Sequence, residues 1–237
     1  TYQRHSNDRL LAPTAGRGDA RAPIGEDEAI QQAAEELGKV DADKLAFVLS
    51  AQNTTEDNLA LAKLAGALGS TRLYLAALGG WEGDDILRSD DNNPNRGGAT
   101  RASGDAELKP LSELVSDVQS GSVAGVVALG WASTEGLDAL SPLRSMSAVV
   151  SLSSHVGALP AVASVAIPVA DTFEVAGSFV NAKGMTQSFS PVLSPPPGIE
   201  PGWRTIADLA GALGKDLGFG DLDGLRKELS DTAEAAQ

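Results

Sequence analysis

The stretch VAGVVALG, residues Val123–Gly130, is the clearest buried strand in the sequence and sets the fold class. A short, continuous apolar run of this kind is typical of a strand that is covered on both faces of a sheet. Comparable strands are expected to begin at Leu45, Thr71, Ala148 and Ser164. The sequence therefore contains five candidate strands for one buried sheet.

Helical patterns separate these strands. Glu26–Leu37 has acidic residues in its first turn and one apolar face. Glu56–Leu68 follows Thr55, an expected N-cap, and ends at Gly69, while Leu111–Gln119 is a third helix. The alternation predicts an α/β fold with a Rossmann-like parallel sheet of about five strands, flanked by helices. With the first strand in the middle, the strand order is 2-1-3-4-5.

Three regions are expected along the chain. Residues 1–25 form a polar N-terminal arm, residues 26–190 form the α/β domain, and residues 191–237 form a Pro-rich linker and C-terminal helices. Inside the domain, Gly79–Pro110 reads as one long irregular stretch, and a loop of that length is usually functional, an interface, or partly disordered. The chain begins with Thr1, and its first residues read as the middle of a longer protein.

Composition narrows the classes of function. The 237 residues carry a formal net charge of −14, which argues against nucleic acid and against an anionic membrane surface. No apolar run is long enough to predict a membrane-spanning helix. There is no Cys and there are only two His, so neither disulfides nor thiol chemistry is expected. Aromatics make up 4% of residues, so Ala, Val and Leu must fill the core.

The nearest candidate for a nucleotide site is the segment Gly130–Gly136, at the carboxyl end of the third strand. Its glycines are six positions apart, the middle glycine of the dinucleotide fingerprint is missing, and no Lys follows. Strand ends are nevertheless where ligands bind in open α/β sheets. If a cofactor were bound here, its contacts would be Gly130, Ser133, Thr134 and Glu135.

Other patterns favour structural roles. Asp91–Asn95, DNNPN, lacks the Gly and Glu that a calcium loop needs and is interpreted as an Asx-rich turn. Ser154 and His155 are adjacent, but we expect a solvent-facing or locally bonded His rather than a catalytic base. Asp171 and Glu174 follow a buried strand and are expected to cap the next turn.

The segment PVADTFEVAGSFVNAKGMTQSF, Pro168–Phe189, resembles the end of the molybdopterin-oxidoreductase fold. An apolar strand ending in Pro and an acidic residue precede a G-x-F-x-N-x-x-G-x-x-Q run, here Gly177, Phe179, Asn181, Gly184 and Gln187. We expect Gly177 and Gly184 in turns, Phe179 as an apolar anchor, and Asn181 bonded to local backbone.

Further segments extend the resemblance over most of the chain. Arg9-Leu10 with Pro13, followed by the segment Pro23–Ile30, resembles the start of the first large lobe of pterin oxidoreductases, and Ser50–Leu64 resembles a strand-to-helix junction of that family. The run from Asp84 to Ala99 is similar to one in the large iron–sulfur subunit (NuoG type) of NADH:quinone oxidoreductase, or complex I.

The resemblance implies a domain that catalyses nothing itself. No Cys stands where molybdoenzymes place a metal ligand, so no cofactor is expected in this chain, and iron–sulfur clusters are expected in a preceding module or in partner subunits. The implied partners are the other subunits of a respiratory complex, and the implied place is peripheral, on the cytoplasmic side of the membrane. The alternative is the pterin guanine dinucleotide-binding part of an active molybdoenzyme such as a formate dehydrogenase.

Overall fold

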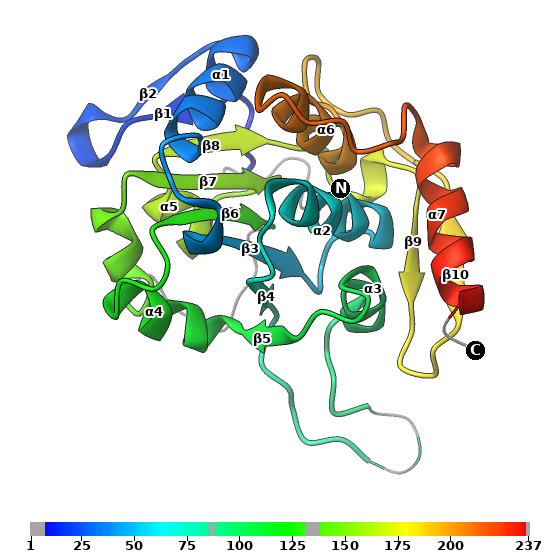
Figure 1. Ribbon diagram of the computed structural model, residues 1–237. Coiled ribbons are helices and arrows are strands. Elements are labelled where there is room, and N and C mark those ends of the chain that lie inside the picture. Colours follow the sequence, from blue (N-terminus) through cyan, green and yellow to red (C-terminus); the bar gives the residue numbers. More distant parts are fainter. Residues whose placement is uncertain (1–7, 85, 87–88, 131–137, 236–237) are drawn as a thin grey trace.

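The computed structural model describes residues 8–84, 86, 89–130 and 138–235, with side chains as far as residue 229. Its centre is one eight-stranded sheet in the order β2-β1-β8-β7-β6-β3-β4-β5 (Figure 1). The strands are β1 Thr14–Ala15, β2 Ala22–Pro23, β3 Leu45–Ser50, β4 Leu73–Ala76, β5 Leu108–Pro110, β6 Gly125–Leu129, β7 Ala148–Ser153 and β8 Val165–Pro168. A separate hairpin consists of β9 Gly177–Val180 and β10 Thr186–Phe189.

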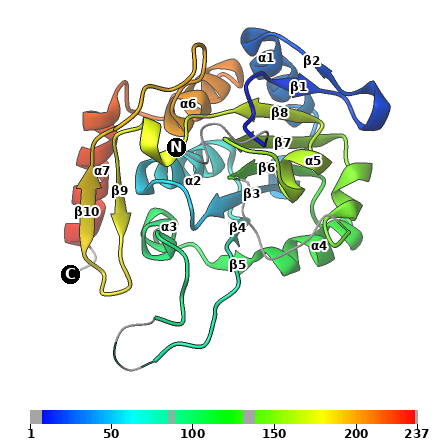
Figure 2. The same ribbon diagram turned by 180° about the vertical axis from the view of Figure 1, so that it is seen from behind.

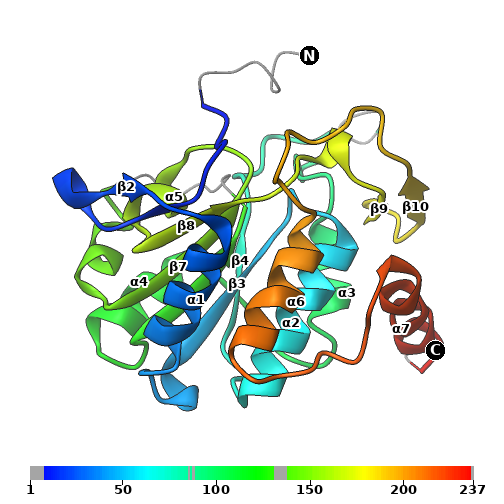
Figure 3. The same cartoon turned by 90° about the horizontal axis from the view of Figure 1, so that it is seen from above.

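Helices cover both faces of the sheet, as the view from above shows (Figure 3). One face carries α1 Glu26–Leu37, α2 Thr55–Leu68 and α6 Gly202–Ala212, and the other carries α4 Leu111–Gln119 and α5 Ala158–Val162. The remaining helices are α3 Arg96–Ala102, α7 Leu222–Ala235 and the 3-10 helices η1 Gly18–Ala20, η2 Ala42–Lys44, η3 Ser141–Ser145 and η4 Thr172–Glu174.

Alternate residues of each central strand enter opposite cores. Phe47 and Leu49 of β3 pack toward α1, α2 and α6, whereas Ala46 and Val48 pack toward α4 and α5. Ala, Val and Leu supply most of both cores, as composition predicted, and Tyr74 is the largest fully buried side chain of the described residues. Each layer is therefore held by many small contacts rather than by a few aromatic anchors.

The predicted parallel order is confirmed. Strands β4, β3, β6, β7 and β8 lie side by side and pair in parallel, which is the order 2-1-3-4-5 of the five expected strands. The prediction of about five strands is wrong, because β5 adds a parallel strand beside β4, and β1 and β2 add antiparallel strands beside β8. These three strands have two or three residues each, too few to leave a periodic pattern.

The stretch Gly79–Pro110 is not irregular throughout, since it contains α3 and β5. Gly97 and Gly98 are poor helix formers, which concealed α3 in the sequence. Close packing requires both glycines. A Cβ on Gly98 would lie 2.1 Å from Asn95 Oδ1, and one on Gly97 would lie 3.0 Å from a methyl carbon of Val180.

The N-terminus of α2 is a buried polar turn. Its N-cap is Thr54, not Thr55 as expected, because Thr54 Oγ1 accepts a hydrogen bond from the Asp57 amide at 3.0 Å. Glu56 Oε2 accepts from the Ser178 amide of β9, and Asp57 Oδ1 accepts from the Trp203 amide of α6. This one turn therefore holds two further segments of the fold, β9 and α6.

The β9–β10 hairpin agrees with the sequence predictions in part. Gly184 has φ +77° in the turn, and Asn181 Oδ1 accepts from the amides of Lys183 and Met185, both as expected. Gly177 lies in β9 rather than in a turn, and the reason for glycine there is steric, because a Cβ would lie 2.5 Å from Thr54 Cγ2. Phe179 is half-buried and stacks edge-on with Phe189, the ring centroids 5.0 Å apart.

Replacing Asp57 by Asn should change how stability depends on pH. Burial raises the pKa of Asp57 to about 6, and hydrogen bonds from Thr54 and Trp203 offset only part of that rise. The folded state then holds the proton more tightly than the unfolded state. The free energy of unfolding therefore falls as the pH rises from about 4 to about 6 and this carboxyl loses its proton. Asp57→Asn should gain up to about 3 kcal/mol relative to the wild type over that range, and the difference should stay constant above it.

Urea unfolding of both proteins at a series of pH values measures this difference. The same substitution at Asp19, an exposed residue of η1, controls for the loss of a carboxylate elsewhere. A difference between Asp57→Asn and wild type that does not vary with pH would contradict the prediction.

Candidate functional site

The carboxyl edge of the parallel strands carries the candidate site. The chain leaves β3 toward β4 on one side and returns to β6 on the other, so the topological switch point lies between β3 and β6. Gly130 follows β6 directly, with φ +84°. A Cβ there would lie 2.6 Å from Ser50 Oγ and 2.7 Å from Asn53 Oδ1, so the glycine lets the end of β3 approach.

Gly130 is the one residue of the predicted cofactor contacts that can be located. Ser133, Thr134 and Glu135 lie outside the described residues. The Gly130 amide donates to the Leu152 carbonyl at 2.8 Å, which continues the pairing of β6 with β7. The predicted position is therefore at the switch point, and its own amide is used in the sheet.

A cavity of about 230 Å³ opens at this edge. It is bounded by Gln52 and Asn53 after β3, Ser154 after β7, the segment Ala170–Phe173 after β8, and by Pro94 and Phe179. Its volume is below the ~300–1,000 Å³ that is usual for small-molecule sites. The described walls thus suit a small polar group rather than a dinucleotide.

A buried ionic cluster lies beside this cavity. Arg9 Nη2 is 2.6 Å from Glu174 Oε2, and the two side chains are 2% and 1% exposed. Arg9 Nη1 is 3.8 Å from Asp171 Oδ2. Residues 8–10 also pair with the segment after β7, where the Leu10 amide donates to the Ser154 carbonyl. Because a buried charge is costly unless it is paired, Arg9 holds the N-terminal segment against the ends of β7 and β8.

Asp171 and Glu174 form the cap that the sequence predicted. Asp171 Oδ1 accepts from the Phe173 amide, and Glu174 Oε2 accepts from the Asp171 amide, which together make a capping box around η4. Glu174 therefore serves both the turn and Arg9. The second role could not be predicted from the sequence, since Arg9 is 165 positions away.

Ser154, His155 and Asp171 lie together without the geometry of a catalytic triad. Ser154 Oγ is 2.9 Å from His155 Nδ1, and Asp171 Oδ2 is 3.6 Å from the same nitrogen. A general base needs its nucleophile and its orienting carboxylate on opposite ring nitrogens. His155 is hydrogen-bonded to its neighbour Ser154, which confirms the predicted local bonding. It is also buried, which was not predicted.

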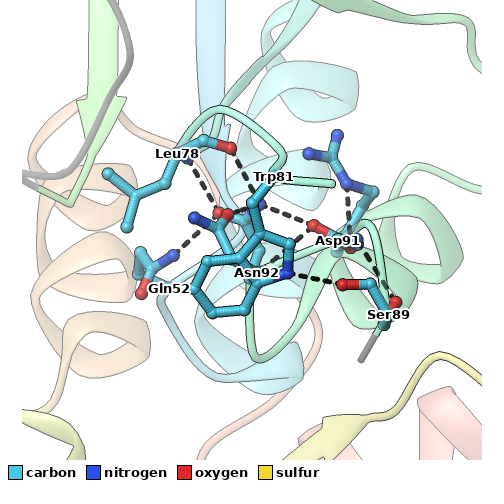
Figure 4. Close-up of polar contacts among 8 residues, drawn as sticks. Gln52, Leu78, Trp81, Ser89, Asp91 and Asn92 are labelled. Carbon is cyan, nitrogen blue, oxygen red and sulfur yellow. Dashed lines mark hydrogen bonds and ion pairs between the residues drawn. The ribbon is translucent and has the colours of Figure 1, made fainter. Parts of the chain in front are cut away.

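The long loop between β4 and α3 is closed at its base by Asn93. Figure 4 shows Gln52, Leu78 and Asp91 around this point, with dashed lines for the polar contacts. Asn93 Oδ1 accepts from the Leu78 amide and from Gln52 Nε2, each at 2.8 Å, and Asn93 Nδ2 donates to the Leu78 carbonyl at 3.0 Å. One side chain therefore joins both ends of the loop to the carboxyl edge of β3.

The expected Asx-rich turn is confirmed. Asp91 Oδ1 accepts from the Asn93 amide at 3.1 Å, and Asp91 Oδ2 pairs with Arg96 Nε at 3.0 Å. Burial alone would raise the pKa of Asp91, but hydrogen bonds from Asn93 and Arg96 outweigh burial and lower it. The carboxylate thus has protein donors in the place where a calcium loop would have the ion.

Asn95 links the same edge to the hairpin. It is fully buried, its Oδ1 accepts from the Val180 amide at 2.8 Å, and its Nδ2 donates to the Asn53 carbonyl at 2.7 Å. Thr55 Oγ1 donates to the Ser178 carbonyl at 2.9 Å beside it. The amide and hydroxyl groups around the cavity are therefore used largely to hold backbone segments together.

No model of a known protein family matches the chain. Within residues 8–84, 86, 89–130 and 138–235, no group of three or more His, Cys, Asp or Glu side chains could hold a metal ion. Across the same residues, no helix combines the length and apolar character needed to cross a membrane.

Asn93→Ala should loosen the base of the loop. The substitution leaves the Leu78 amide and carbonyl without their side-chain partner, at a cost of about 1–2 kcal/mol in local stability. We expect faster hydrogen exchange at the Leu78 amide and faster proteolysis within residues 79–90, with the sheet still protected. Asn92→Ala is the matched control, because Asn92 Oδ1 makes only a 3.3 Å contact with Asn93 Nδ2. Equal exchange in both variants would contradict a closing role for Asn93.

Proposed function

We propose that this chain is a non-catalytic structural domain of an NADH:quinone oxidoreductase, with a molybdopterin-oxidoreductase-like fold. It packs beside the iron–sulfur modules of the peripheral arm, on the cytoplasmic side of the membrane. The strand-to-helix junction at Glu56–Asn58, the Asn-Pro-Asn run and the Asn181 segment supply the resemblance. The parallel sheet with helices on both faces is consistent with it.

One observation carries the proposal. The polar residues of the resembling motifs hold the backbone instead of facing an open site. Asn93 closes a loop, Asn95 joins the hairpin to β3, and Asn181 bonds its own turn. Polar side chains that are hydrogen-bonded to backbone in this way are expected in a domain that has a structural role and no active site.

The chemistry of the chain supports the same proposal. Iron–sulfur clusters are held by cysteine thiolates, and this sequence has none. The clusters that carry electrons would then belong to a preceding module or to partner subunits, and this domain would support them mechanically.

The loop between β4 and α3 is the proposed docking element. It extends away from the body of the protein (Figure 1). Trp81 is 49% exposed and Ile86 is 86% exposed, although both are large and apolar. Exposed aromatic and aliphatic side chains on a loop with a fixed base are suited to anchor a partner subunit.

The alternative function is the binding of a pterin guanine dinucleotide in an active molybdoenzyme. The position of Gly130 at the switch point favours it. The cavity of about 230 Å³ and the engaged polar side chains favour the structural role instead. The metal and pterin content of the purified protein distinguishes the two functions.

The purified chain should contain no stoichiometric molybdenum, tungsten or iron. The physical reason is the absence of thiolate ligands, which soft metal centres require. Elemental analysis, together with pterin fluorescence of the acid-denatured supernatant, measures both metal and cofactor. A stoichiometric pterin or metal would remove the structural proposal and support the alternative.

Trp81→Ala should weaken assembly without weakening the fold. The ring is half-exposed on the loop, so we expect an unchanged melting temperature and a loss of about 2 kcal/mol in association with the partner subunit. Co-purification with the other subunits of the complex measures association. Val192→Ala, at another exposed apolar residue, is the control and should assemble normally. Normal assembly of Trp81→Ala would exclude the loop as the docking element.

A further inference from the structure

A second, larger cavity lies between the N-terminal hairpin and α5, away from the base of the long loop. Its volume is about 440 Å³. Figure 2 shows β1 and β2 beside α5, and hydrogen bonds from the hairpin to α5 confirm that they are neighbours. Three arginines line the cavity, Arg17 and Arg21 from the hairpin and Arg144 from η3. Leu10, Val156 and Pro160 are among its apolar walls.

Backbone carbonyls hold two of these guanidinium groups in place. Arg17 donates to the carbonyls of Leu143 and Met146, at the end of η3. Arg21 donates to the Pro160 carbonyl at 3.0 Å and to the Ala163 carbonyl, at the end of α5. These bonds fasten the hairpin to the body. A guanidinium group has five N–H donors, so both side chains retain donors for a further partner.

Fastening the hairpin does not account for the whole cluster. Arg144 is exposed and makes no hydrogen bond or ion pair with the described residues. Within the described part of the chain, no Asp or Glu oxygen lies within 4.0 Å of any of the three guanidinium groups. In a protein of net charge −14, this is a local concentration of unpaired positive charge.

The charges also act on one another. Burial lowers the pKa of Arg21, and the neighbouring charges of Arg17 and Arg144 lower it further. Burial lowers the pKa of Arg17 as well, and Glu36 offsets this only in part. An anion placed among the three groups would relieve this repulsion, and planar guanidinium groups match carboxylate and phosphate oxygens well.

We propose that this cavity binds a small organic anion, whose carboxylate or phosphate lies among Arg17, Arg21 and Arg144 and whose apolar part lies against Leu10, Val156 and Pro160. The volume is in the range of small-molecule sites, ~300–1,000 Å³. The polar donors are few and convergent, and the remaining walls are apolar, which is the usual composition of such sites. The proposal does not depend on the structural role proposed above.

Calorimetric titration of the full chain with phenyl phosphate tests the site. Benzyl alcohol, which is neutral and similar in its apolar part, is the ligand control. We expect saturable binding of phenyl phosphate and none of benzyl alcohol. Arg144→Gln should weaken phenyl phosphate binding at least about tenfold, since it removes one charge-assisted contact. It should not disturb the fold, because Arg144 holds no described segment in place.

Arg204→Gln is the protein control, because Arg204 is exposed on α6 and outside the cavity. It removes the same charge and should leave phenyl phosphate binding unchanged. Three results would overturn the proposal: no saturable binding up to about 10 mM, equal binding of benzyl alcohol, or equal weakening by Arg144→Gln and Arg204→Gln. The last result would indicate a general effect of net charge.

Discussion

The buried first turn of α2 is the constraint on which the rest of the structure depends. Glu56 is fully buried and joins β9 to α7, through the Ser178 amide and an ion pair with Arg226 at 3.0 Å. Asp57 caps α6, and Asn58 bonds both the amide and the carbonyl of Ser50. Three consecutive polar side chains thus connect α2 to the neighbouring strand β3 and to three elements that are distant in sequence, β9, α6 and α7.

This arrangement has a physical cost that explains the close packing around it. Buried polar groups are destabilising unless each one is bonded, so every partner must be held in register. Gly177 and Gly202 allow this close packing. A Cβ on Gly177 would lie 2.5 Å from Thr54 Cγ2, and a Cβ on Gly202 would lie 2.9 Å from Asp57 Oδ1. The Asn58 side-chain amide also takes the place of a neighbouring strand at Ser50, beyond the last residues at which β3 pairs with β6. Its Oδ1 accepts from the Ser50 amide, and its Nδ2 donates to the Ser50 carbonyl.

Local patterns were sufficient for the central layers and insufficient for everything that tertiary contacts decide. The bounds of α1 and α4 and the start of β3 follow from hydrophobic period and turn residues, and the structure confirms them. The edge strands and α3 could not be predicted, because pairing with β8 or β4 and packing on Val180 specify them. At the site, the Asx turn and the cap at Asp171 are local and were predictable. The pairing of Arg9 with Glu174 was not, since nothing in either segment signals the other.

The same constraint suggests where this domain can act. At the carboxyl edge of the parallel strands, side chains hold β3, the β9–β10 hairpin and the base of the long loop together. This edge therefore has few groups left to recognise a ligand. Exposed apolar side chains and a cluster of arginines lie farther out. Trp81 and Ile86 are exposed on a loop that Asn93 closes at its base. Arg144 faces the cavity between α5 and the N-terminal hairpin of β1 and β2. A rigid interior combined with exposed apolar side chains and an arginine-lined cavity at the periphery favours a domain that works through its outer surface, because binding there does not require the buried polar turn to change.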